Sequence, residues 1–198
     1  MPDFELEKQA ALNGYKYVCG VDEAGRGPLA GPVCAAAVIL DPDTELEGVK
    51  DSKKLSEKKR ETLYDVICSK ALAYSIAFAT VEEIEEYNIL NATYLAMNRA
   101  IEGLKIKADF ALIDGNRVPK DIKTECRTVV KGDAKSLSIA AASILAKVTR
   151  DRLLLEYDKK YPEYNFAKHK GYGTVEHMEA IRKFGPSEVH RPSFLKKL

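Results

Sequence analysis

The chain has 198 residues, 45% of them hydrophobic, and its 31 Lys and Arg nearly balance its 30 Asp and Glu, which gives a net charge of +1. This length suits one sizeable globular domain, and the hydrophobic fraction is ordinary for such a domain. No apolar run is long enough to span a membrane, and the N-terminus has no secretory pattern. We therefore expect a cytoplasmic protein without membrane contact, and a monomer.

The four cysteines are widely separated and form no Cys-x-x-Cys pair. This spacing indicates neither a zinc site nor a disulfide framework. It is typical of reduced core thiols in a protein of the cytoplasm. We expect such thiols at Cys19, Cys34, Cys68 and Cys126.

The first half of the sequence alternates short apolar runs with helical patterns. In chain order it predicts strands over residues 15–23 and 33–40, a helix after Ser56, a strand over residues 73–79, and two helices between Thr80 and Gly103. Ser56 fits an N-cap, and Thr80 with Glu83 fits a capping box. The segment 25–32, with three glycines and two prolines, joins the first two strands.

The second half predicts two strands followed by helices. They are strands ending at Asp114 and Asp133, one long helix or two joined helices over residues 136–161, a loop over residues 165–173, and a helix after Thr174 that points Val175, Met178 and Ile181 inward. Pro162 closes the long helix, and Gly185 closes the last one. This order predicts an α/β fold with a mixed sheet and an all-helical C-terminal part.

Three apolar runs each lead to a carboxylate. The first is followed by Asp22 and Glu23, the second by Asp114 and the third, across two further residues, by Asp133. Because ligands of open α/β sheets sit outside strand ends, neighbouring strands would bring these four carboxylates together. Such carboxylates repel one another, and a pair of divalent cations would relieve the repulsion and help to hydrolyse a phosphodiester. The pattern therefore predicts a metal-dependent nuclease site.

A simpler interpretation also exists for these acids, because Asp is common in the turns that follow strands. Asp22 and Glu23 pose a further question, since adjacent residues of a strand point to opposite faces of the sheet. Both reach one site if a bend or bulge at Ala24-Gly25 re-aims one of them.

Two glycine-containing loops are candidate substrate sites. The backbone N–H groups of Gly25-Arg26-Gly27 can form a nest for an anion or a hydroxyl, with Arg26 as a phosphate partner; the alternative is a tight turn. Tyr172, between glycines and near cations, suits stacking on a sugar or base; the alternative is a buried tyrosine that anchors its loop. His169 has no visible partner, and we assign it no catalytic role.

Lysine and arginine side chains cluster in two regions, around residues 50–60 and through the C-terminal fifth of the chain. Such patches suit contacts with phosphates, and the alternative is a solvated helix face with a basic tail. Phe194-Leu195, close to basic residues, leaves two interpretations open: a peptide that binds a replication clamp, or a tail that packs on a helix. Of the two we favour packing.

Six ordered motifs resemble those of bacterial ribonuclease HII. They are Gly20–Pro28, Asp51–Ser56, Ile113–Asn116, Val130–Asp133, Ala141–Asp151 and His169–Thr174. The resemblance extends from about residue 18 to residue 194. The six motifs in this order are far more specific than any one of them alone.

The resemblance implies the ribonuclease H-like fold, a central mixed five-stranded sheet flanked by helices. Residues 1–160 would form the catalytic domain, and residues 161–198 a helical substrate-binding segment packed on it. The resemblance also implies endonucleolytic cleavage of the RNA strand of RNA–DNA hybrids, and incision 5′ of single ribonucleotides embedded in duplex DNA. The implied mechanism uses two divalent ions, Mn²⁺ or Mg²⁺, and leaves a 3′-OH and a 5′-phosphate. Such an activity supports ribonucleotide removal and DNA replication and repair.

Matching the motifs residue by residue assigns roles to individual positions. The metal-binding and catalytic positions fall on Asp22, Glu23, Asp114 and Asp133. The reader of the ribose 2′-OH falls on Gly25, Arg26 and Gly27, the stacking tyrosine on Tyr172, and contacts with the nucleic-acid backbone on Lys53 and Lys54. Asp151 is an alternative fourth carboxylate, but it lies four residues after Lys147, so an ion pair within one helix is a sufficient reason for it. We prefer Asp133 because we expect it at a strand end.

Two other functions remain open. Another nuclease of the same fold, such as a proofreading exonuclease or a junction resolvase, also gathers carboxylates, but it has no ribose for residues 25–27 to read. A non-catalytic module that binds nucleic acid would use the basic patches, but it has no need for four acids that repel a polyanion.

Overall fold

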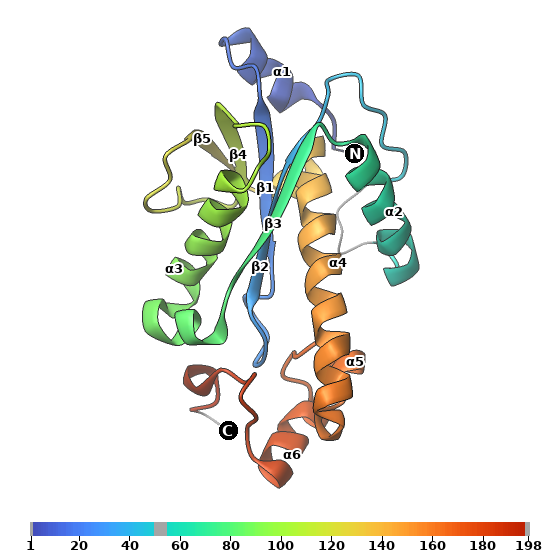
Figure 1. Cartoon of the computed structure of the whole chain (residues 1–198), viewed down its shortest axis with the longest axis vertical. Helices are drawn as coiled ribbons and strands as arrows, with labels where there is room; N and C mark the ends of the chain where they lie inside the picture. Colours follow the sequence, from blue (N-terminus) through green and yellow to red (C-terminus); the bar gives the residue numbers. More distant parts are fainter. Residues whose placement is uncertain (1, 50–54, 197–198) are drawn as a thin grey trace.

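A mixed five-stranded sheet forms the centre of the structure (Figure 1). The computed structural model describes residues 2–49 and 55–196. In spatial order the strands are β3 (Ala73–Ala79), β2 (Val33–Ile39), β1 (Val18–Ala24), β4 (Phe110–Asp114) and β5 (Glu125–Val129). β1 pairs antiparallel with β2 and parallel with β4. Since Val21 is opposite Ile113 in this register, Asp22 of β1 lies beside Asp114, the last residue of β4.

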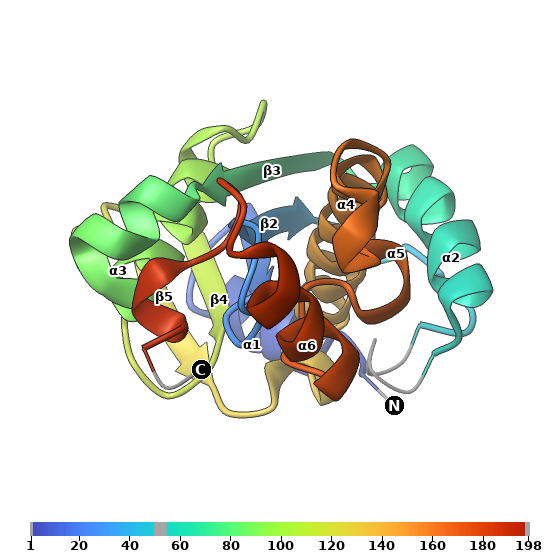
Figure 2. The same cartoon turned by 90° about the horizontal axis from the view of Figure 1, so that it is seen from below.

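Helices cover both faces of the sheet, as the view from below shows (Figure 2). They are α1 (Glu5–Leu12), α2 (Glu57–Lys70), α3 (Val81–Glu102), α4 (Leu137–Lys160), α5 (Phe166–His169) and α6 (Val175–Phe184). α3 packs on one face, against Ala35 and Ala37 of β2, while α2 and α4 pack on the other, against Cys34 and Ala36. Because both faces are covered, all seven residues of β2 are buried, which explains the unbroken apolar run.

Small residues let α4 lie close against β1. A Cβ on Gly20 would lie 2.1 Å from the carbonyl carbon of Ser138, so only glycine fits at this position. The alanines at positions 140–142 of α4 are fully buried. This close approach brings the hydroxyl of Ser143 on α4 within hydrogen-bond reach of the carboxylate of Asp22.

The C-terminal segment, with α5 and α6, lies below the sheet in Figure 1. One isolated bridge, between Ala30 and His190, ties it to the segment that joins β1 and β2. Phe194 packs against the main core on the α3 side, and Leu195 packs against a small core that joins the C-terminal segment to Ala30 and to Leu154 of α4. These contacts agree with the packed tail that we favoured.

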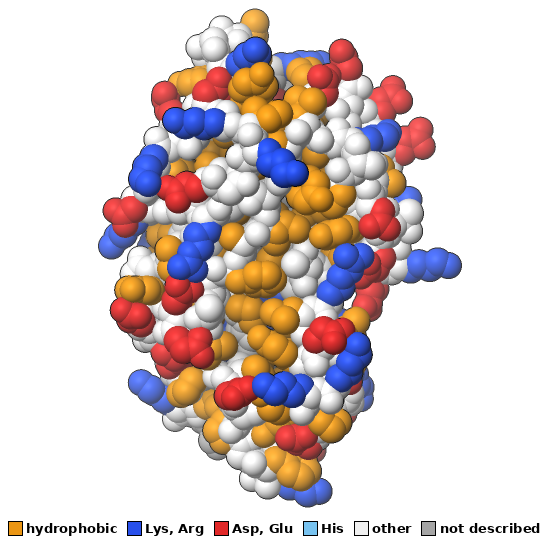
Figure 3. Space-filling model, in the orientation of Figure 1, with side chains coloured by type: hydrophobic (Ala, Val, Ile, Leu, Met, Phe, Trp, Pro, Cys, Tyr) orange, Lys and Arg blue, Asp and Glu red, His pale blue; other side chains and the backbone are white. Residues whose placement is uncertain are grey.

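The surface and the thiols agree with the composition. On the face seen in Figure 3, acidic and basic side chains are interspersed on both sides of a hydrophobic strip, and neither sign dominates. All four cysteines are free. No helix within residues 2–49 and 55–196 is both long and apolar enough to cross a membrane.

Most of the predicted elements and their end signals are confirmed. The strand over residues 73–79, the N-cap Ser56 and the capping box at the start of α3 are present, and residues 137–160 form one helix. The two helices predicted between Thr80 and Gly103 make up α3, which is divided by the non-helical Asn88 with a φ of 66°.

The predicted position of Asp133 at a strand end is wrong. β5 ends at Val129, and Asp133 lies in the 3-10 helix Gly132–Ala134 that precedes α4. The strand cannot continue to this residue because Lys131 adopts a left-handed conformation, with a φ of 55°, and turns the chain.

Two expectations about the C-terminal part are also wrong. The loop predicted over residues 165–173 contains the short helix α5. Val175 is 67% exposed, whereas Ile181 is buried as predicted; α6 turns His177 inward together with Ile181, four residues later. Lys53 and Lys54 lie outside the described residues, so their predicted role stays a prediction.

Candidate active site

A buried arginine from the far end of the chain holds the segment between β1 and β2. The guanidinium of Arg191 donates hydrogen bonds to four backbone carbonyls, those of Gly25 (2.6 Å), Arg26 (3.0 Å), Pro28 (2.8 Å) and Gly31 (2.6 and 2.8 Å). Because these carbonyls satisfy its donors, Arg191 is fully buried without needing a carboxylate partner. Burial, and then the charge of Arg150, lower the pKa of Arg191 to about 9, so it stays charged at neutral pH.

A second buried guanidinium supports the rest of the same segment. Arg150 of α4 donates to the carbonyls of Ala30 (2.9 Å), Pro32 (3.1 Å) and Lys170 (3.1 Å). Gly25 makes room for it, since a Cβ there would lie 2.1 Å from the Nε of Arg150, and its φ of +97° also favours glycine. The two arginines therefore join segment 25–32, α4 and the C-terminal segment.

The direction of these carbonyls fixes the direction of the N–H groups in the loop. In a trans peptide the C=O and N–H bonds point to opposite sides, and no cis peptide occurs in the described residues. Because the carbonyls of Gly25 and Arg26 point at Arg191, the N–H groups of Arg26 and Gly27 point away from it. Within the described residues neither N–H has a hydrogen-bond partner. Both are available to an acceptor.

A pocket of about 220 Å³ lies beside this loop, at the C-terminal ends of β1 and β4; we call it the carboxylate pocket. It gathers seven of the residues that the sequence singled out, namely Asp22, Glu23, Gly25, Arg26, Gly27, Asp114 and Tyr172. Ser143, Lys147 and Arg150 of α4 complete its wall. The sequence analysis did not identify these three, or Arg191, as site residues.

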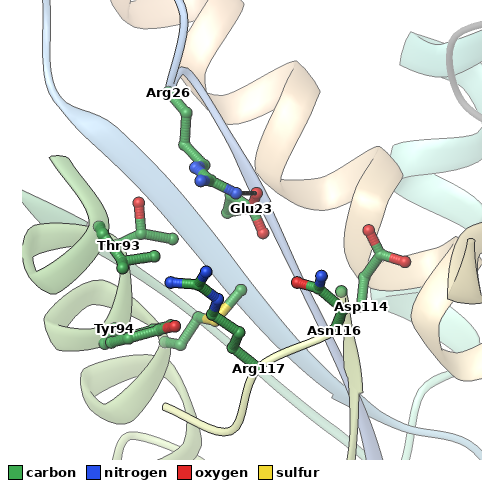
Figure 4. A pocket seen from close by; sticks show the side chains of 10 residues that line it. Glu23, Arg26, Thr93, Tyr94, Asp114, Asn116 and Arg117 are labelled. Carbon is green, nitrogen blue, oxygen red and sulfur yellow. Dashed lines mark hydrogen bonds and ion pairs between the residues drawn. The ribbon is translucent and has the colours of Figure 1, made fainter. Parts of the chain in front are cut away.

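Asp22 and Glu23 point to opposite faces of the sheet. Asp22 lies on the α4 side with Ser143, whereas Glu23 pairs with Arg26 at 3.3 Å and faces α3 (Figure 4). The pairing of β1 with β2 is regular through Ala24, so the expected bulge is absent. Both acids border the same pocket because it lies at the end of the strand, where both faces of the sheet are accessible.

Burial and mutual repulsion make the ionised carboxylates unfavourable. Burial raises the pKa of Asp22 well above its usual range, and the charges of Glu23 and Asp114 raise it further. Burial also raises the pKa of Glu23, although Arg26 opposes the shift. Asp114 accepts a hydrogen bond from the backbone N–H of Gly132 at 2.6 Å.

The carboxylate oxygens of these three residues fit a divalent cation of the Mg²⁺ or Mn²⁺ type, which prefers such ligands. A cation at Asp22, Glu23 and Asp114 would compensate the repulsion that raises the pKa values. Among the described residues, however, no three carboxylate, imidazole or thiol groups already stand close enough to enclose an ion. An ion such as Mg²⁺ needs only one or two of these carboxylates, because it usually keeps several water ligands.

The two candidates for the fourth carboxylate differ in their surroundings. Asp133 is 7% exposed and follows Gly132, the residue that binds Asp114, but it does not line the carboxylate pocket. Asp151 is buried and pairs with Lys147 at 2.7 Å, four residues earlier on α4, as expected. Asp151 thus has a structural partner that explains its presence.

The three histidines of the chain support the loop that carries Tyr172. The Nδ1 of His177 donates to the carbonyl of Tyr172 (2.9 Å), so its unprotonated Nε2 accepts from the Nε2 of His190 (3.0 Å). His190 in turn accepts at Nδ1 from the backbone N–H of Ser187 (2.9 Å). His169 stacks on His177 with ring centres 4.2 Å apart. Burial lowers the pKa of His177 and of His190 to about 4, so both rings are neutral at neutral pH.

Tyr172 itself is 46% exposed, so it is not the buried anchor that was its alternative. Its ring passes close to the loop of residues 25–27, since a Cβ on Gly27 would lie 3.7 Å from the Tyr172 ring. The backbone of Tyr172 is fixed by the histidines while its ring borders the carboxylate pocket. An exposed aromatic face on a rigid loop suits stacking on a ligand.

Comparison with known proteins identifies close relatives. The sequence model of the family described as Ribonuclease HII matches residues 19–197. The chain is 56% identical over 195 residues to the Ribonuclease HII of Caldicellulosiruptor bescii, covering 98% of this chain and 94% of that protein.

Solved structures agree with this relationship. The crystal structure of ribonuclease H2 from Pyrococcus horikoshii OT3 is similar, with a TM-score of 0.75 and 30% identity, over 90% of this chain and 93% of that one. The RNase HII in a complex with PCNA from Archaeoglobus fulgidus is also similar, with a TM-score of 0.77 and 26% identity, over 92% and 96% of the two chains.

Replacing Arg191 by Met should strongly destabilise the protein. The change leaves four inward carbonyls without donors, so we expect the free energy of unfolding to fall by about 3–5 kcal/mol in urea titrations. Arg152→Met is the matched control, because the Arg152 side chain is 45% exposed and pairs with Glu61 on the surface. It should cost about 1 kcal/mol or less. Equal losses in the two variants would contradict the assigned role of Arg191.

Replacing Asp22 by Asn should stabilise the metal-free protein. Because the pKa of Asp22 is raised in the folded state, its ionised form weakens the fold at neutral pH, and this cost disappears as the pH falls toward the usual value of 3.8. In EDTA the variant should therefore melt higher than the wild type at pH 8, and its advantage should shrink by pH 5. The exposed Asp43→Asn should show no such trend. A stability advantage of the variant that grows as the pH falls would contradict the expected direction of the pH dependence.

Proposed function

Because the chain belongs to the ribonuclease HII family, it is a ribonuclease H endonuclease, and we propose that its substrates include duplex DNA with a single embedded ribonucleotide as well as RNA–DNA hybrids. We propose incision on the 5′ side of the ribonucleotide. The observation that carries this proposal is the pair of free N–H groups on Arg26 and Gly27, held beside Asp22, Glu23 and Asp114 in one pocket. Such incision would serve ribonucleotide removal during DNA replication and repair.

Ribonucleases H depend on divalent metal ions. We propose that Asp22, Glu23 and Asp114 hold Mg²⁺ or Mn²⁺, with Asp133 joining them from the turn that binds Asp114. Two such ions, when bound, lower the barrier to phosphodiester hydrolysis at neutral pH and favour 3′-OH and 5′-phosphate products. The residues themselves would position the substrate, and a bound cation would offset the burial and repulsion that disfavour their ionised carboxylates.

The loop supplies the specificity for ribose in this proposal. The N–H groups of Arg26 and Gly27 donate to the 2′-OH, and Arg191 behind the loop keeps them aimed. A site built to bond a hydroxyl rejects a substrate that lacks it, because its donors are then left unpaired. Tyr172 provides the face on which the sugar or base rests.

The C-terminal segment, residues 161–198, then acts as the substrate-binding part packed on the catalytic domain of residues 1–160. It supplies Tyr172 to the pocket and Arg191 to the loop. Lys53 and Lys54 are proposed to contact the nucleic-acid backbone. A proofreading exonuclease or a resolvase would leave the ribose reader without use, and a binding module would leave the buried acids without use.

A gel assay on a duplex with one embedded ribonucleotide tests the proposal. We expect one incision 5′ of the ribonucleotide with Mg²⁺ or Mn²⁺ and none in excess EDTA. Asp22→Asn and Asp114→Asn should lose turnover while still folding, because they remove proposed ligands. Asp151→Asn, which alters only the partner of Lys147, should keep substantial activity, and Asp133→Asn should not. Cleavage in EDTA, or a cyclic phosphate product, would rule out this mechanism.

The role of Tyr172 is tested by truncating its ring. Tyr172→Ala should lower cleavage at a single ribonucleotide by roughly tenfold to a hundredfold, since stacking contributes about 1–3 kcal/mol. Metal affinity should change little, because no proposed ligand is altered. Tyr172→Phe keeps the ring and serves as the control; a loss as large as that of the alanine variant would assign the contact to the hydroxyl. Equal cleavage of all-deoxy duplexes by the wild type would eliminate the ribose reader.

A further inference from the structure

A second pocket, of about 340 Å³, adjoins the carboxylate pocket and shares Glu23, Arg26 and Asp114 with it. Its other walls come from α3 and from the turn after β4. We call it the arginine pocket; its remaining side chains are Leu90, Thr93, Tyr94, Met97, Asn116 and Arg117. Nothing in the function proposed above uses these six residues.

Two guanidinium groups border this pocket from opposite sides. Arg26 enters from the loop after β1 and Arg117 from the turn after β4, with the carboxylate of Glu23 near Arg26 (Figure 4). Within the described residues Arg117 makes no hydrogen bond or ion pair. The Asp114 carboxylate turns away from Arg117 (Figure 4) and bonds to Gly132. Arg26 gives only its Nη1 to Glu23, so its other guanidinium donors, like those of Arg117, are available to an anionic ligand.

The opposite wall is apolar and is built by an interrupted helix. Asn88, with a φ of 66°, breaks α3, and its side chain accepts hydrogen bonds from the backbone N–H groups of Leu90 (3.0 Å) and Asn91 (3.2 Å). The helix restarts there and presents Leu90, Tyr94 and Met97 on one face. The Thr93 hydroxyl donates a hydrogen bond to the carbonyl of Ile89 (2.7 Å), so it adds little polarity to this wall.

A cationic rim above an apolar wall suits one unit of a nucleic-acid strand. The guanidiniums match a phosphate in charge and in hydrogen-bond geometry, and the wall of Leu90, Tyr94 and Met97 suits a sugar or base. Because Glu23 and Arg26 border both pockets, consecutive phosphates of one strand can occupy them.

We propose that the arginine pocket binds the phosphodiester next to the scissile one in the cleaved strand, between Arg26 and Arg117. This inference rests on the proposed function and adds to it a second point of recognition. The first point reads the hydroxyl of the ribonucleotide, and the second fixes the neighbouring phosphate. Together they set which bond of the strand lies against the carboxylates.

The test combines Arg117→Gln with single neutral phosphates. A set of duplexes carries one methylphosphonate in the cleaved strand, placed at each successive position on either side of the ribonucleotide. We expect the wild type to lose about tenfold or more in kcat/KM at one position that flanks the scissile bond. Arg117→Gln should lose a similar factor on the unmodified duplex and lose little more at that position. At every other position the variant and the wild type should respond alike.

Lys105→Gln is the matched control, because Lys105 is exposed and lies before β4, at the opposite end of that strand from the site. It should match the wild type on every duplex.

Unchanged melting of Arg117→Gln would show that its loss of activity does not come from unfolding, as expected for an exposed side chain. Two results would overturn the proposed role of the arginine pocket alone. One is an unchanged kcat/KM in Arg117→Gln; the other is that the losses from the substitution and from the methylphosphonate multiply at every position. Failure of the wild type to incise the unmodified duplex would overturn the proposed function and this inference with it.

Discussion

The bonds from the buried Arg191 guanidinium to the backbone of residues 25–31 are the contacts on which the rest of the site depends. This segment contains three glycines, and so many conformations are open to it that ordering it is costly. The planar guanidinium has five donors in a fixed arrangement and bonds all four carbonyls, whereas a lysine has only three donors. Since Arg191 comes from the C-terminal segment, residues 25–31 depend on that segment for the donors that satisfy their inward carbonyls.

The site separates its charges rather than pairing them all. The positive charges of Arg150 and Arg191 lie behind the loop and are satisfied by carbonyls, while Asp22 and Glu23 lie at the strand end in front of it. The buried cations polarise the intervening peptides, so the outward N–H groups become better donors. The acids keep an excess of negative charge, which raises the pKa of Asp22 and favours a cation.

The histidines contribute rigidity rather than proton transfer. Histidine is the usual group that titrates near neutral pH, but burial lowers the pKa of His177 and His190 to about 4. Every nitrogen of these two rings has a partner in the neutral form. The hydrogen bonds that hold the loop of Tyr172 therefore do not depend on a histidine charge at neutral pH.

The sequence by itself determined the apolar runs that lead to Asp22 and Asp114, the helix caps and seven residues of the pocket, because each has a local signal. Asp22 and Asp114 follow apolar runs, Ser56 and Thr80 cap helices, and Gly25 permits a positive φ. Tertiary structure alone decided the hydrogen-bond partners of Arg150, Arg191 and the histidines. It also placed Arg117 and Arg26 around one pocket. These arrangements bring together residues that are distant in the chain, and they leave no periodic pattern in the sequence. The sequence placed Asp133 wrongly at a strand end for a related reason. The chain turns at Lys131, which adopts a left-handed conformation although it is not a glycine, and no sequence pattern marks such a turn.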